Sequence, residues 1–145
     1  MSQDPAQIPS EWGVFTRATT TLSDGEVLIH DWYATGGEPE LMLRTADPAE
    51  AVDLVSRLAT FFADESGWHR RASDAVVAEF SEGPPEPAEL DEAAEDLMLE
   101  TVEVHPGGDL VLHLDDSCCR HFSSGYWPAV RFDADGFVTA VTVEA

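Results

Sequence analysis

The residue types best suited to chemistry are concentrated in the irregular segment 115–127, which reads Asp-Asp-Ser-Cys-Cys-Arg-His-Phe-Ser-Ser-Gly-Tyr-Trp. Cys118, Cys119 and His121, with a neighbouring aspartate, are potential ligands for a metal ion. Structural zinc sites usually separate their cysteines by about two to four residues, a spacing that adjacent cysteines do not have. A small metal-binding domain or metal-dependent enzyme using these three residues is therefore the alternative interpretation.

A second group of potential ligands lies just upstream. His105 and His113 fall on neighbouring predicted strands and can share a face with Glu103. Two histidines and one carboxylate form the metal site of some oxygenases. On a hairpin the same trio is more often three polar residues facing water, and we favour that interpretation.

Charge points to a different kind of function. All seven basic residues are arginine, and the formal net charge is -22. Between Ala72 and Cys119 there are fourteen acidic residues and no Lys or Arg. Such a field repels nucleic acid and anionic membranes and steers a basic protein toward the chain. The alternative is that the acidic surface only keeps the protein soluble.

The expected contact surface combines acidic residues of the third predicted helix with the 115–127 segment. Aromatic residues flanked by acidic ones are suited to binding hot spots. The candidate partner-binding residues are Glu92, Glu95, Asp96, Asp115, Asp116, Tyr126 and Trp127.

Length and composition indicate what must position these residues. A chain of 145 residues, 43% hydrophobic with four Trp and seven Phe, predicts a single folded domain over 1–145. The N-terminus lacks the pattern of a signal peptide, and two cysteines do not make a disulfide framework, so we expect a cytoplasmic protein.

The first half of the chain predicts strands. Residues 1–10 carry two prolines and are expected to form a flexible tail. Gly13–Thr20, Glu26–Tyr33 and Pro39–Arg44 are separated by turn residues and predict a three-stranded meander.

Three helices are expected next. Asp47 to Ala63 begins with a capping Asp and Pro48, and its apolar residues recur at helical spacing. Gly67 is expected to break that helix, followed by helices over 68–80 and 87–98. The basic cluster 68–71 is expected to form ion pairs with the third helix.

The last third predicts antiparallel strands over 99–105, 110–114, 129–132 and 137–143. Placing the apolar residues of the first two on one face requires an odd-length turn, of three or five residues, with Gly107 or Gly108 at positive φ. Glu103, His105 and His113 then lie on the other face. The order strands, helices, strands predicts an α+β domain, one sheet packed with two or three helices, and not a parallel βαβ sheet.

Residues 45–144 resemble a family of small bacterial proteins known only as a domain of unknown function. The likeness rests on the aspartate pair 115–116, Phe122, Gly125 and Val130, with Tyr126 at the position of the family's His. The resemblance implies a bacterial cytosolic domain and supplies no activity.

Size and acidity also make the chain similar to immunity proteins, which neutralise toxins by covering their active sites. The hypothesis from the sequence is a non-enzymatic binding module without a cofactor, such as an immunity protein that binds a basic partner.

Overall fold

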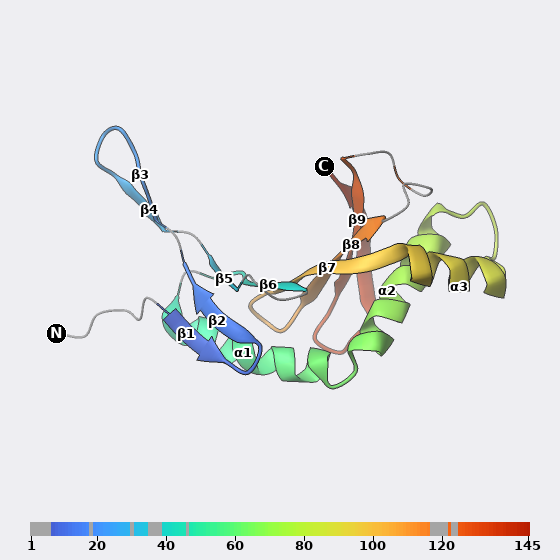
Figure 1. Ribbon diagram of the computed structural model, residues 1–145, viewed down its shortest axis with the longest axis horizontal. Coiled ribbons are helices and arrows are strands. Elements are labelled where there is room, and N and C mark those ends of the chain that lie inside the picture. Colours follow the sequence, from blue (N-terminus) through green and yellow to red (C-terminus); the bar gives the residue numbers. More distant parts are fainter. Residues whose placement is uncertain are drawn as a thin grey trace.

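The computed structural model of the 145-residue chain describes residues 7–17, 19–29, 31–34, 39–45, 47–116, 122 and 125–145 (Figure 1). It contains three helices: α1 (Pro48–Phe62), α2 (Glu65–Phe80) and α3 (Pro87–Asp96). The strands before the helices are β1 (Gln7–Ser10), β2 (Gly13–Thr16), β3 (Thr19–Thr21), β4 (Val27–Ile29), β5 (Trp32–Ala34) and β6 (Glu40–Leu43). Those after them are β7 (Leu97–Val104), β8 (Leu110–Asp116), β9 (Trp127–Phe132) and β10 (Val138–Glu144).

Eight strands form one sheet in the order β1-β2-β5-β6-β7-β8-β9-β10. β6 and β7 are parallel, whereas the other neighbouring pairs of this sheet are antiparallel. The α+β class is confirmed, but the expectation of a sheet without a βαβ connection is wrong at this pair. The three helices carry the chain from the end of β6 back to the start of β7, which makes these two neighbours parallel.

The predicted three-stranded N-terminal meander is only partly present. Its first two strands are each interrupted, so that β2 pairs with β5 while β3 and β4 form a separate hairpin that projects from the sheet (Figure 1). Thr16 pairs with Tyr33, but Thr19 pairs with Ile29, so the register shifts by one residue between the two halves. The two halves of this hairpin therefore do not share one register.

Part of the expected flexible tail is a strand. Gln7–Ser10 forms β1 and pairs with β2, and Ile8 lies opposite Phe15. Both side chains are buried in the core. Pro9 is compatible with β1 because β1 is an edge strand, where a missing N–H need not disrupt the ladder.

The first predicted helix is confirmed. Asp47 caps α1 by accepting a hydrogen bond from the Ala49 N–H at 3.1 Å, and Pro48 is the first helical residue. One stripe of α1 is buried against the sheet: Ala51, Leu54, Leu58 and Phe61.

The other two helices differ from expectation at their ends. Gly67 lies inside α2 instead of breaking the helix, and a Cβ there would lie 2.2 Å from an oxygen of Asp64. A side chain at this position would have to displace the Asp64 carboxylate, which glycine leaves in place. α3 ends at Asp96 because the next two residues already pair with β8 as part of β7. The expected ion pair between the basic cluster and α3 is confirmed, since Arg70 lies 2.9 Å from Asp91.

The predicted hairpin register is confirmed. Val102 pairs with Leu112 and Val104 with Leu110, and all four are buried. The His105 N–H donates to the carbonyl of Asp109 at 2.9 Å, which closes a three-residue loop. Both glycines of that loop have positive φ, 90° at Gly107 and 96° at Gly108.

The two faces of the sheet are chemically distinct. One face packs against α1 and α2 around large buried side chains that include Trp32, Phe15, Phe61 and Phe132. The other face is left uncovered by the described helices (Figure 1) and carries charged and half-buried polar residues. Among the described residues, no helix is long and apolar enough to cross a membrane.

Candidate functional site

The uncovered face of the sheet holds a hydrogen-bonded cluster at its centre. Glu103 on β7 contacts the Nε2 atom of His113 on β8, and the Trp127 indole on β9 donates to Nδ1 of the same ring at 3.0 Å. Three neighbouring strands therefore contribute one residue each. The sequence prediction that Glu103 and His113 share a face is confirmed, whereas the contribution of Trp127 was not foreseen.

This arrangement assigns the protonation of the His113 ring. An indole nitrogen can only donate, so Nδ1 must accept and the neutral ring carries its proton on Nε2. That proton is directed to the Glu103 carboxylate. Both ring nitrogens are thus engaged, and neither has a lone pair available for a metal ion.

The surroundings of Glu103 also oppose a cation. Arg44 lies 3.1 Å from Glu103 and 3.4 Å from Asp31. Burial raises the pKa of Glu103, but the hydrogen bond from His113 and the charge of Arg44 outweigh it, so the pKa lies below the usual 4.5. Within the described residues, no group of three His, Cys, Asp or Glu side chains is arranged to hold a metal ion.

His105 lies on the same face, beside but not within the cluster. Its Nε2 atom is 3.7 Å from Glu103, is buried, and has no hydrogen-bond partner among the described residues. Burial and the nearby charge of Arg131 lower the pKa of His105 below its usual 6.5. Arg131 itself is held by Asp109 at 3.0 Å.

Two hollows flank the cluster, of about 340 Å³ and about 220 Å³. Glu103 and His113 line both of them. At the centre of this contoured face, Glu103 is paired with His113 and Arg44.

The candidate partner-binding residues lie mostly at one end of the sheet. Glu92 and Glu95 are exposed on α3, and Asp96 immediately precedes β7. Leu97, the first residue of β7, pairs with Asp116 at the end of β8. The chain thus brings the last turn of α3 next to the end of β8.

Members of this group differ in exposure. Asp115 is exposed, but Asp116 is buried and accepts a hydrogen bond from the Phe122 N–H at 2.9 Å. Tyr126 is 52% exposed, whereas Trp127 is half-buried and its indole donates a hydrogen bond to His113. Tyr126 and Asp115 are therefore free to contact a partner, while Asp116 and Trp127 support the local structure.

The alternative metal ligands Cys118, Cys119 and His121 lie outside the described residues, and the metal-binding hypothesis stays a prediction.

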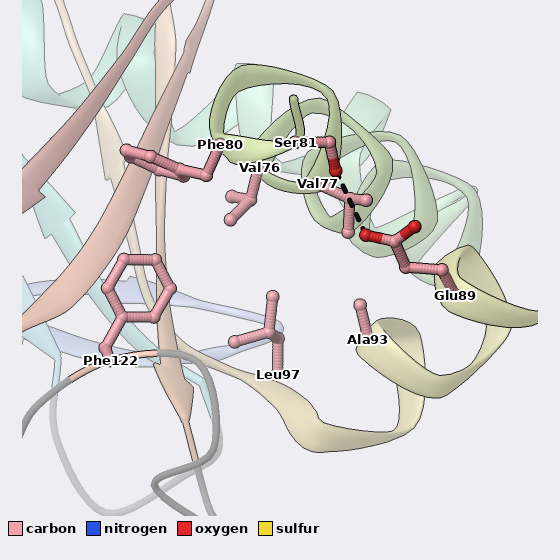
Figure 2. A pocket seen from close by; sticks show the side chains of 8 residues that line it. All are labelled: Val76, Val77, Phe80, Ser81, Glu89, Ala93, Leu97 and Phe122. Carbon is pink, nitrogen blue, oxygen red and sulfur yellow. Dashed lines mark hydrogen bonds between the residues drawn. The ribbon is translucent and has the colours of Figure 1, made fainter. Parts of the chain in front are cut away.

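A third hollow, of about 340 Å³, lies between α2 and α3 and is largely apolar (Figure 2). Its walls are Val76, Val77, Phe80, Ser81, Glu89, Ala93, Leu97 and Phe122. Phe80, the last residue of α2, is 53% exposed at this hollow. The sequence feature that could have indicated this hollow is the small side chain of Ala93, which lies on the side of α3 that faces α2.

Comparison of the chain with protein-family models, with curated proteins and with solved structures finds no match. The arguments about function therefore rest on the residues of this chain.

Proposed function

We propose that this protein is a non-enzymatic binding module whose acidic surface recognises a basic protein partner. An immunity protein that covers the active site of a basic toxin is the concrete form of this proposal. The observation that supports this proposal most directly is that α3 ends beside the end of β8. Glu92, Glu95 and Asp115 are exposed on these two elements.

Charge supports this choice of partner. The described residues between Ala72 and Asp116 include no Lys or Arg that would neutralise this end of the molecule. Arg70, the arginine that reaches α3, is already engaged by Asp74 and Asp91. The acidic end consequently has more carboxylates than basic side chains, and its net negative charge attracts a basic surface and accelerates its association.

The polar cluster on the sheet favours recognition over catalysis. Glu103 and His113 hydrogen-bond each other, and His113 is fixed by Trp127. A general base or nucleophile needs a free lone pair directed at a substrate. In this cluster the pairing leaves a rigid surface, which is useful for binding because little side-chain freedom is lost on association.

The test is the association rate with a basic protein that co-purifies with the chain. We expect this rate to fall steeply as ionic strength rises. Glu92→Lys combined with Glu95→Lys should slow association strongly. Glu11→Lys combined with Glu26→Lys changes the net charge equally in the N-terminal part of the chain and should have a smaller effect. A salt-independent rate, or equal effects of the two double variants, would contradict the proposal.

A further inference from the structure

The hollow between α2 and α3 arises from side-chain size. α3 presents Ala93, which is 1% exposed, to the part of α2 that carries Val76 and Val77. These short side chains hold the helices together at their contact but leave about 340 Å³ open beside it. Leu97 at the start of β7 forms the floor, so three elements enclose the space (Figure 2).

Aromatic rings form the other wall of this hollow. Phe80 at the end of α2 packs edge-to-face with Phe122, with ring centroids 5.6 Å apart. Phe80 nevertheless leaves 53% of its surface exposed. A large aromatic side chain exposed beside an apolar hollow gains further burial when another apolar group enters.

The mouth of the hollow is acidic. Glu89 lines it and accepts a hydrogen bond from the Ser81 hydroxyl at 3.0 Å, which holds the carboxylate at the rim. Glu82 and Glu86 are exposed in the loop between the two helices. A cationic group is favoured beside the hollow, and an anionic one is repelled.

We propose that this hollow receives one bulky apolar side chain of a protein partner, with an Arg or Lys of the same segment placed against Glu89. The inference rests on the proposed function. It adds that the basic partner anchors itself by this one apolar side chain. A second copy of the chain is a poor occupant, because each copy carries a charge of -22 and the two repel each other.

The experiment follows the methyl signals of Val76, Val77 and Leu97 by NMR during titration with three blocked tripeptides. The probes are arginine–phenylalanine–arginine, arginine–serine–arginine and glutamate–phenylalanine–glutamate. We expect the first to shift all three methyl groups and to bind about tenfold more tightly than the second, because only the first buries an aromatic ring. The acidic peptide should shift none of them.

Two variants test the two parts of the proposal. Ala93→Met fills the hollow and should remove the advantage of the phenylalanine peptide over the serine peptide. Glu89→Gln leaves the hollow open and should weaken the phenylalanine peptide about two- to fivefold, the range for an exposed ion pair. Glu79→Gln removes the same charge from an exposed position of α2 that does not line the hollow and is the matched control. Glu89→Gln keeps the test valid if Ala93→Met does not fold.

The outcomes separate this inference from the proposed function. If both arginine peptides bind equally and the three methyl groups do not shift, the anchor inference is overturned while recognition of basic segments stands. If neither arginine peptide binds, both fail. NMR contacts between these methyl groups and another segment of the chain would also overturn the anchor inference, because the chain itself would then fill the hollow. Methyl shifts that depend on protein concentration alone would overturn it too, because a second copy would then fill the hollow.

Discussion

Trp127 fixes the cluster of Glu103, His113 and Trp127, because its indole N–H determines which nitrogen of the His113 ring carries the proton. We expect the ¹⁵N spectrum of the imidazole to show an unprotonated Nδ1 and a protonated Nε2. Trp127→Phe should remove this preference and lower the free energy of unfolding by about 0.5–1.5 kcal/mol, the net value of one hydrogen bond. Trp12→Phe, at an indole that stacks on Phe62, should leave the ring signals of His113 unchanged. The opposite tautomer in the wild type would contradict this geometry.

Part of this cluster could be predicted from the sequence. Strand alternation places Glu103 and His113 on the face opposite the buried valines and leucines, and that much was correct. Trp127 was not foreseen because it belongs to β9, which begins earlier than its β-branched residues indicate. Its contact with His113 depends on the pairing of β8 with β9, which local periodicity does not reveal.

Glu103 should make stability depend on pH. Its pKa is lowered in the folded protein, so the unfolded chain takes up a proton first as the pH falls. The resulting stabilisation is fully present above the usual pKa of about 4.5 and is lost as the pH falls through the lower folded value. Denaturant unfolding across this range should show a smaller loss for Glu103→Gln than for the wild type.

The control for that experiment is Glu95→Gln, which removes one exposed carboxylate from α3. In this variant, the decrease in the free energy of unfolding as the pH falls should be close to that of the wild type. Equal pH profiles for Glu103→Gln and the wild type would mean that the pairing with His113 and Arg44 contributes nothing to stability.

At the scale of elements, α1 anchors the helical layer through Leu58, which is fully buried. Leu58→Ala should lower the free energy of unfolding by about 2–5 kcal/mol, because it removes buried methyl groups and leaves a cavity. Val52→Ala is the matched control, since Val52 is 54% exposed on the same helix and should cost far less. A loss below about 0.5 kcal/mol for Leu58→Ala, within the range of surface substitutions, would mean that this face does not pack on the sheet.

The elements that were predicted well are those whose signals are local. The Asp47 cap and the apolar stripe of α1 lie within one helix, and the glycine turn at 107–108 fixes the adjacent register. The parallel pairing of β6 with β7 joins strands separated by three helices, so no local pattern encodes it. The split of the first hairpin accompanies a one-residue shift between its two pairings, which local periodicity does not reveal.

At the scale of the whole molecule, the two edges of the sheet are protected differently. β1 is a four-residue strand that contains Pro9, and both features discourage further pairing. β10 has seven residues, carries no charge before Glu144, and leaves Val138 and Val143 exposed. Such an edge is a template for pairing with another chain.

Net charge opposes such pairing, because two chains of charge -22 repel each other before their edges meet. The sequence isoelectric point is about 4.1, and near that pH the repulsion disappears. We therefore expect light scattering to show self-association through β10 as the pH approaches this value. Thr142→Lys places a charge on the β10 edge and should suppress the self-association. Thr21→Lys adds the same charge on β3 and should suppress it less. Equal suppression by both variants would attribute self-association to net charge alone and remove the role of the β10 edge.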